Sequence, residues 1–172
     1  MRLLPLLLTF LPFVGCAQPV PNNAEVGSAA FQQKLQRLLR FDVPVLNAEE
    51  AYTKRDSVTF LDTREPQEYA VSHLPGALLL GYNEPDYDVL DDLPKDAPLV
   101  LYCSVGYRSE RIGRQLRKRG FTNVRNLYGS IFEWVNAGYP VVDNAGYPTD
   151  KVHTFNKKWS QWVEDGKAEK VY

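Results

Sequence analysis

The sequence predicts an α/β protein built on a parallel sheet. Short apolar segments typical of buried strands alternate along the chain with segments whose apolar residues recur at helical spacing. Glycine, proline and capping residues mark the boundaries between them. Because this alternation is typical of parallel strands joined by helices, we expect a five-stranded parallel sheet flanked by helices on both faces.

The first half of the chain supplies three of the expected strands. Apolar residues at helical spacing predict a helix over residues 28–40. Asn47 followed by Glu50 resembles a capping box and predicts the start of a second helix. The remaining elements expected here are strands over 43–46 and 57–61, the latter ending at Asp62, a short helix over 65–70, and a turn at 74–76 leading into 77–80.

The second half supplies the other two strands. The apolar segment 99–102 predicts a strand, and the helix expected over 110–119 ends at Gly120, which suits the left-handed position that terminates many helices. The pattern is completed by a strand over 123–127 and a helix over 131–136, which the segment 138–140 (Gly-Tyr-Pro) is expected to end. Ligands of parallel sheets bind beyond the carboxyl ends of the strands, and Cys103 lies at such an end.

The tail, residues 144–172, differs in character from the rest. Its aromatic residues predict a helix over 156–164 with one apolar face, which we expect to pack back on the domain. A partner-binding role for its two tryptophans is the alternative. The residues of this face are Phe155, Trp159, Trp162 and Val163.

The composition excludes several classes of protein. The 172 residues suffice for one domain with additional segments. With 20 Lys and Arg against 21 Asp and Glu, the net charge of −1 provides no electrostatic footprint for nucleic acid. A hydrophobic content of 44% argues against wholesale disorder.

The N-terminus predicts export. Arg2 precedes an apolar run, residues 3–14, which is too short to span a bilayer and fits a secretory signal over residues 1–15. The segment Phe13-Val14-Gly15-Cys16 resembles a bacterial lipobox, so we expect Cys16 to carry lipid and anchor the protein in the cell envelope, facing the periplasm. Ordinary signal cleavage, giving a soluble periplasmic protein, is the alternative. Residues 16–41 then form a tether and an N-terminal helix.

Cysteine usage points to reactivity. The chain has two cysteines, and lipidation of Cys16 would leave Cys103 without an intramolecular partner. In an exported protein a disulfide framework is the usual pattern, so a lone cysteine suggests chemistry. A buried, inert thiol is the competing interpretation.

The segment that follows this cysteine favours chemistry. Between the strand and the next helix lies Cys103-Ser104-Val105-Gly106-Tyr107-Arg108-Ser109. Successive backbone N–H groups in such a loop form a concavity that binds anions, and the helix N-terminus adds partial positive charge. These donors are expected to lower the pKa of the Cys103 thiol from its ordinary value of about 8.5 and favour the nucleophilic thiolate.

Four segments, spread over residues 42–143, together resemble the rhodanese-like (sulfurtransferase) family. Their order and spacing make the resemblance specific, whereas a lone Cys-x4-Arg would be weak. Each corresponds to a motif of that family: residues 61–69 (LDTREPQEY), 72–77 (SHLPGA), the loop 103–109, and 120–140, which holds GFTNV and a final GYP.

The resemblance implies a three-layer rhodanese-like fold and a persulfide mechanism. Cys103 would take the outer sulfur of a donor such as thiosulfate or a persulfide, and pass it to a thiol or cyanide. Arg108 would close the loop and orient an anionic donor. The N–H groups of Ser104, Val105, Gly106, Tyr107 and Ser109 would hold the transferred sulfur. No cofactor or metal is implied.

The length of the loop separates this chemistry from that of tyrosine phosphatases. Those enzymes place five residues between cysteine and arginine, whereas four stand between Cys103 and Arg108, so the ring suits one sulfur atom better than a phosphate. The loop also departs from the commonest family pattern. Ser104 stands in place of an arginine, and the loss of this positive charge weakens the case for thiosulfate as the sulfur donor. Tyr107 stands in place of an asparagine, and its ring is expected either to narrow the entrance of the site or to contact an apolar acceptor.

Other polar residues receive structural roles. Asp62 and Arg64 are expected to form a supporting ion pair near the site, and His73 to bond backbone within its turn. Glu65 and Glu68 are interpreted as solvent-exposed charges at the start of a helix. Arg111, Arg114 and Arg117, at intervals of three, form either a solvated face or a positive field beside Cys103.

Two functions other than sulfur transfer remain open at this point. The fold could serve as a non-enzymatic binding or sensing module, or Cys103 could relay oxidation through mixed disulfides.

Overall fold

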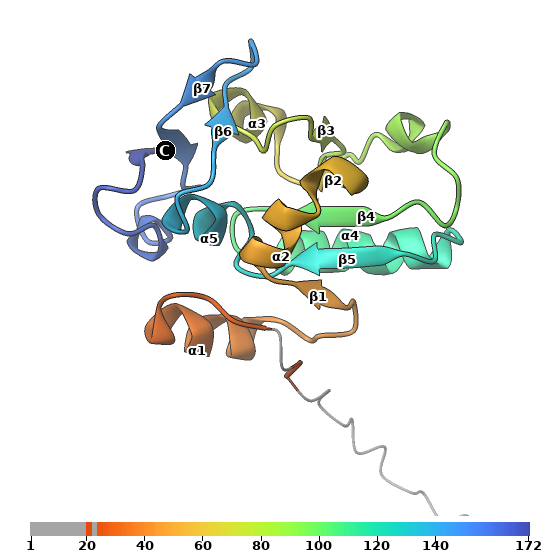
Figure 1. The fold of residues 1–172 in the computed structure, drawn as a ribbon, viewed down its shortest axis with the longest axis horizontal. Helices are drawn as coiled ribbons and strands as arrows, with labels where there is room; N and C mark the ends of the chain where they lie inside the picture. Colours follow the sequence, from red (N-terminus) through yellow and green to blue (C-terminus); the bar gives the residue numbers. More distant parts are fainter. Residues whose placement is uncertain (1–19, 22–23) are drawn as a thin grey trace, which may run out of the picture.

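The computed structural model describes residues 20–21 and 24–172, so the expected signal sequence and Cys16 lie outside the described residues. A five-stranded parallel sheet, in the order β1-β5-β4-β2-β3, forms the centre (Figure 1). Its strands are β1 (Val45–Leu46), β2 (Thr59–Asp62), β3 (Leu78–Leu79), β4 (Leu99–Tyr102) and β5 (Val124–Leu127). The predicted parallel sheet is confirmed.

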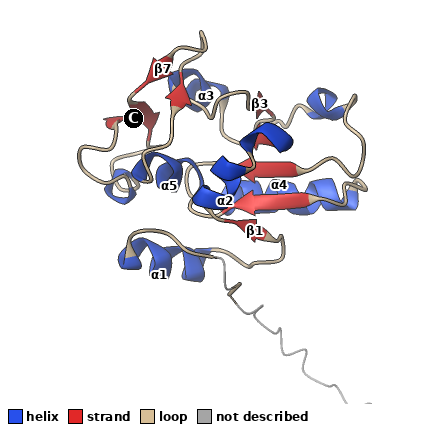
Figure 2. Ribbon diagram, viewed as in Figure 1, coloured by secondary structure: helices blue, strands red, loops and turns tan. Residues whose placement is uncertain are grey.

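Helices cover both faces of the sheet, as Figures 1 and 2 show. On β4, Leu99 and Leu101 face one apolar cluster with α4, whereas Val100 and Tyr102 face a second cluster that includes α1 and α5. The three-layer expectation is therefore confirmed. The helices are α1 (Ala29–Leu38), α2 (Ala48–Thr53), α3 (Pro66–Val71), α4 (Tyr107–Lys118) and α5 (Ser130–Asn136), with 3-10 helices η1 (Arg55–Ser57), η2 (Tyr87–Leu90) and η3 (Ser160–Trp162).

Local capping explains where several helices begin. The Asn47 side chain accepts the Glu50 N–H at 2.8 Å, and the Glu50 carboxylate accepts the Asn47 N–H, so the predicted capping box is present. The helix predicted from Glu110 begins earlier, at Tyr107, directly after Gly106. Gly106 has a φ of 109°, which a residue with a Cβ adopts only with strain. The chain thus turns from loop to helix within one residue.

The tail corrects the sequence prediction. In place of a helix over 156–164 there is only the 3-10 turn η3, because Phe155 has a φ of 64° and the Asn156 side chain accepts the N–H groups of Lys158 and Trp159, which forms a tight turn. Phe155 is 54% exposed and does not join a buried face.

The rest of the tail packs on the domain, as expected. The Trp162 ring stacks on Phe31 of α1 with centroids 5.3 Å apart, and Val163 is buried. Asn136, at the end of α5, donates to the Trp162 carbonyl and accepts the Glu164 N–H, both at 2.9 Å. The tail and the segment before it hold the short strands β6 (Val141–Val142), β7 (Pro148–Thr149), β8 (Lys151–His153) and β9 (Glu169–Val171).

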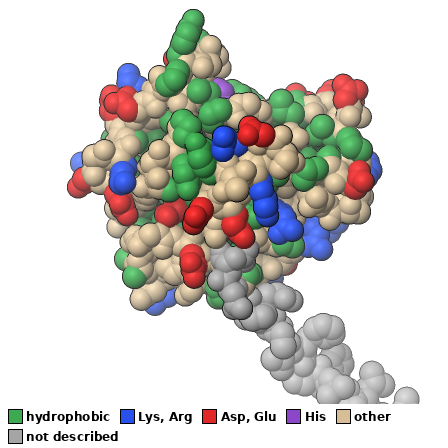
Figure 3. All heavy atoms as spheres, in the orientation of Figure 1, with side chains coloured by type: hydrophobic (Ala, Val, Ile, Leu, Met, Phe, Trp, Pro, Cys, Tyr) green, Lys and Arg blue, Asp and Glu red, His purple; other side chains and the backbone are tan. Residues whose placement is uncertain are grey.

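Charge is mixed over the face of the molecule that Figure 3 shows, in keeping with the composition. In the view of Figure 3, acidic and basic side chains are interspersed, with hydrophobic side chains among them. Among residues 20–21 and 24–172, no helix has both the length and the apolar character that a bilayer crossing needs.

A buried ion pair fixes the carboxyl end of β2, as the sequence predicted. Arg64 and Asp62 are fully buried, with Nη2 of Arg64 2.6 Å from Oδ2 of Asp62, and the same nitrogen donates to the Ser72 carbonyl at 2.6 Å. His73 also bonds backbone, with Nδ1 3.1 Å from the Tyr69 carbonyl oxygen. The pair therefore ties β2 to the far end of α3.

We expect Arg64→Met to lower the free energy of unfolding by about 3–5 kcal/mol, because Asp62 would remain as a buried, unpaired carboxylate. Urea unfolding followed by circular dichroism measures the change. Asp56→Asn is the matched control, since Asp56 belongs to an exposed pair with Arg55, and it should cost less than about 1 kcal/mol. Equal effects of the two substitutions would contradict this role of Arg64.

Candidate active site

Cys103 lies where the carboxyl end of β4 meets the N-termini of α4 and α5. Its side chain is buried, with the residue 1% exposed. Its N–H donates to the Ser130 hydroxyl at 3.2 Å, and its carbonyl accepts the Ile131 N–H at 3.2 Å. Cys103 therefore lies at the edge of the parallel sheet where ligands of such sheets bind.

The loop from Cys103 to Ser109 curls around the cysteine sulfur. The Gly106 N–H donates to Sγ of Cys103 at 3.1 Å, and the N–H groups of Val105 and Ser109 also act on the sulfur by lowering the pKa of the thiol. The sequence predicted inward-pointing amides from Ser104 to Ser109, and those of Val105, Gly106 and Ser109 act on the sulfur. Because α4 begins at Tyr107, the last of these donors belongs to the first turn of that helix.

Side chains behind the loop hold it in this shape. Asn126 of β5 donates to the Gly106 carbonyl at 3.0 Å, and its Oδ1 accepts the Ser109 hydroxyl at 2.7 Å. On the other side, the Phe132 N–H of α5 donates to the Ser104 carbonyl at 3.3 Å. The Ser104 and Gly106 carbonyls are thereby bonded to neighbouring elements, which fixes the path of the loop around the sulfur.

Arg108 closes the site through an ion pair with Glu68, and this pairing corrects the prediction that Glu68 is a solvated charge. The Glu68 carboxylate, expected to be solvated, is 1% exposed and binds the Arg108 guanidinium through two bonds of 2.6 and 2.8 Å. Glu68 keeps its expected place in the first turn of α3, where it accepts the Glu65 N–H. It is buried because α3 follows β2 at the same sheet edge as the cysteine loop.

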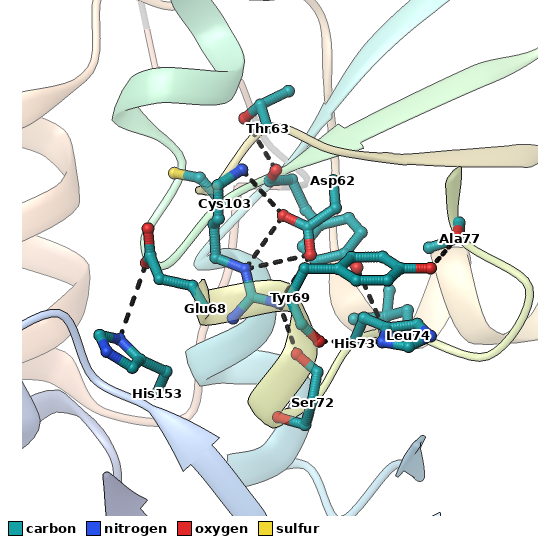
Figure 4. A network of polar contacts seen from close by, with 12 residues as sticks. Asp62, Thr63, Glu68, Tyr69, Ser72, His73, Leu74, Ala77, Cys103 and His153 are labelled. Atoms are coloured by element: carbon teal, nitrogen blue, oxygen red, sulfur yellow. Dashed lines mark hydrogen bonds and ion pairs between the residues drawn. The ribbon is translucent and has the colours of Figure 1, made fainter. Parts of the chain in front are cut away.

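This network continues to Ser104 and to the tail. Arg108 Nη2 donates to the Ser104 hydroxyl at 3.0 Å. Figure 4 shows the Glu68 carboxylate between Cys103 and His153 of β8. Nδ1 of His153 lies 4.0 Å from Glu68 Oε1 and accepts the Phe155 N–H at 3.1 Å, so in the neutral ring its proton is on Nε2.

The electrostatics favour the thiolate. Burial alone would raise the pKa of Cys103, but the Arg108 charge and the N–H groups of Ser109, Gly106 and Val105 outweigh it, so the pKa lies below its ordinary value. Burial would likewise raise the pKa of Glu68, but the hydrogen bonds and charge of Arg108 lower it, so the pair is ionised near neutral pH.

The arginines of α4 beyond this site lie outside the network. Arg114 bonds the Asp42 carboxylate at 2.9 Å, Arg117 donates to the Asp42 carbonyl, and the exposed Arg111 donates to the Tyr107 hydroxyl at 3.1 Å. Asp62 and Arg64 likewise support the neighbouring turn and are not among the residues that bond the Cys103 sulfur. Cys16, expected to carry lipid, lies outside the described residues.

Comparison with known proteins finds relatives that are named as sulfurtransferases. A sulfurtransferase of Allochromatium vinosum is 34% identical over 91 residues, which are 53% of this chain and 84% of that protein. The thiosulfate sulfurtransferase GlpE of Pseudomonas fluorescens is 34% identical over 95 residues, 55% of this chain and 85% of that protein.

A solved structure supports the fold. The polysulfide-sulfur transferase of Wolinella succinogenes, a homodimer, superimposes with a TM-score of 0.53 at 22% identity, over 68% of this chain and 90% of that one. The family model described as the rhodanese-like domain matches residues 47–137, more than half of the chain. The chain therefore belongs to the rhodanese-like domain family.

Proposed function

We propose that this protein is a sulfurtransferase that carries sulfur on Cys103 as a persulfide. The observation that supports this most directly is the cysteine loop, whose amides surround the buried Cys103 sulfur. The positive charge of Arg108 also stabilises the thiolate. Relatives named as sulfurtransferases support sulfur transfer at the level of the family. The donor class is a small molecule with a sulfane sulfur, and the acceptor is a thiol or cyanide.

Two half-reactions describe the proposed chemistry. The Cys103 thiolate attacks the outer sulfur of thiosulfate, the sulfur–sulfur bond breaks, and sulfite leaves with the bonding electrons. The amides of the loop then hold the terminal sulfur of the anionic Cys103 persulfide. Cyanide or a thiolate attacks that sulfur, and Cys103 is released as a thiolate. A general base is not needed, because the loop already favours the deprotonated form.

We propose in addition that the protein is exported and anchored to the cell envelope through lipid on Cys16. The support is the apolar run before Cys16 and the lipobox-like segment in which it stands. The tether after Cys16 would let the domain reach substrates at the membrane surface.

Incubation with thiosulfate should leave the protein one sulfur atom heavier, with the addition on Cys103, and cyanide should then release it as thiocyanate. Intact-mass spectrometry and a thiocyanate assay measure the two steps. Cys103→Ser should abolish both, whereas Cys16→Ser, which removes the other cysteine of the chain, should retain both. A protein whose Cys103 stays a free thiol with thiosulfate and with organic persulfides would instead be a binding or sensing module. A mixed disulfide on Cys103 would point to a redox relay.

Arg108→Gln should raise the pKa of Cys103, because it removes the main charge that stabilises the thiolate and leaves Glu68 unneutralised beside it. The rate of iodoacetamide alkylation as a function of pH reports this pKa, so the midpoint should move to higher pH. Arg108→Lys is the matched variant, since it keeps the charge but loses the paired bonds, and its shift should be smaller. An unchanged midpoint in Arg108→Gln would contradict the role given to Arg108.

Expression of the full sequence in bacteria supplied with an alkyne-tagged fatty acid tests the anchor. The wild-type protein should take up the label and sediment with membranes. Cys16→Ala should lose the label and appear in the soluble fraction. Unlabelled wild-type protein in the soluble periplasmic fraction would support ordinary signal cleavage instead.

A further inference from the structure

A pocket of about 310 Å³ opens above Cys103. This volume is at the lower end of the range for organic ligands, roughly 300–1,000 Å³. Cys103, Ser104, Val105 and Arg108 form its floor, and the walls are apolar or aromatic: Leu38, Tyr82, Tyr107, Phe155 and Trp159. The pocket therefore offers more apolar surface than an inorganic sulfur donor can contact.

The charge of the pocket also disfavours a small dianion. Among the described residues that line it, Arg108 is the one charged side chain, and its guanidinium is bound through two bonds by Glu68. The Glu68 carboxylate therefore already balances the positive charge of Arg108, and the Cys103 thiolate adds a further negative charge to the site. Arg111 stands outside the lining and bonds the hydroxyl of Tyr107. A doubly charged donor such as thiosulfate thus gains little net attraction in the pocket.

Three of the wall residues come from outside the family domain. Leu38 belongs to α1, and Phe155 and Trp159 belong to the tail, whereas the family match covers residues 47–137. The tail is fixed in place against α1, since Trp162 stacks on Phe31. The cysteine loop lies within the part of the chain that the family model matches, whereas these three wall residues lie outside it.

The backbone of Phe155 is strained, and burial of its side chain does not compensate for that strain. Its backbone has a φ of 64°, which is strained for a residue with a large side chain, and more than half of the residue is exposed. Nδ1 of His153 accepts a hydrogen bond from the Phe155 N–H. The centroid of the Phe155 ring lies 5.6 Å from the guanidinium carbon of Arg108. An aromatic ring held open at the mouth of a reactive pocket is suited to contact a ligand.

We propose that the sulfur donor of this protein carries an apolar organic group, preferably aromatic, which packs between Phe155, Trp159 and Leu38. The inference rests on the proposed function, and it names the class of donor for the same site. The Cys103 thiolate attacks the outer sulfur of a donor R–SO₂–S⁻, and the bond between the two sulfur atoms breaks. The sulfinate R–SO₂⁻ leaves with the electron pair, and Cys103 keeps the transferred sulfur as a persulfide anion. The pocket walls bind R and leave the reacting sulfur at the loop.

Benzenethiosulfonate and methanethiosulfonate test this proposal, because they carry the same charge and the same reacting group and differ in R. Release of the sulfinate gives kcat/KM for loading Cys103, normalised to the uncatalysed reaction of each donor with cyanide. We expect the wild-type protein to prefer the aromatic donor by about tenfold or more, from the apolar surface buried.

Phe155→Asn should reduce this preference about fivefold, because it removes one aromatic contact, and asparagine tolerates the left-handed backbone. Tyr147→Asn is the matched control. It removes a 70% exposed aromatic ring that does not line the pocket, and it should leave the preference unchanged. Equal use of the two donors by the wild-type protein, or equal effects of the two substitutions, would overturn the proposal.

Binding to Cys103→Ser separates this proposal from the proposed function. Calorimetry with the two thiosulfonates measures the selectivity of the pocket without any reaction. Tighter binding of the aromatic donor would support the organic-donor proposal even if Cys103 of the wild-type protein failed to accept sulfur, a failure that would count against sulfur transfer alone. Equal or undetectable binding of both thiosulfonates would overturn the organic-donor proposal.

Discussion

The site depends on the pairing of Glu68 with Arg108. A thiolate is costly to bury, and the amides of one short loop must share the task of stabilising it with a full positive charge. That charge is itself buried for the most part, and it remains in place because a carboxylate from another helix binds both of its terminal nitrogens. The carboxylate joins α3 to the start of α4, so the reactivity of the sulfur is coupled to the packing of these two helices.

Much of the fold could be predicted from local patterns. The strand 99–102 and the capping box at Asn47 depend on residues that are neighbours in the sequence, and the structure has both. The Asp62–Arg64 pair could be predicted for the same reason, since the two residues are two positions apart. The inward-pointing loop amides followed from a glycine between a strand and a helix. In each case, short-range geometry determines the outcome.

The errors have a different physical origin. The interpretation of Glu68 as a solvated charge was correct about its position in the helix, but its partner is 40 residues away, which local patterns do not reveal. One signal was available: α3 and the cysteine loop both follow parallel strands, whose carboxyl ends share one edge. The tail was assigned a helix from the spacing of its aromatic residues, but a side-chain turn at Asn156 and tertiary contacts with α1 and α5 determine its path.

The contact between Phe31 and Trp162 bears on how this protein should be dissected. It joins the two segments that flank the family domain, one before it and one after it. A fragment trimmed to residues 47–137 would keep the nucleophile with its amides, but both flanks would be gone. Such a fragment would lack Leu38, Phe155 and Trp159 of the pocket wall, so its behaviour toward sulfur donors would not represent the pocket of the intact chain.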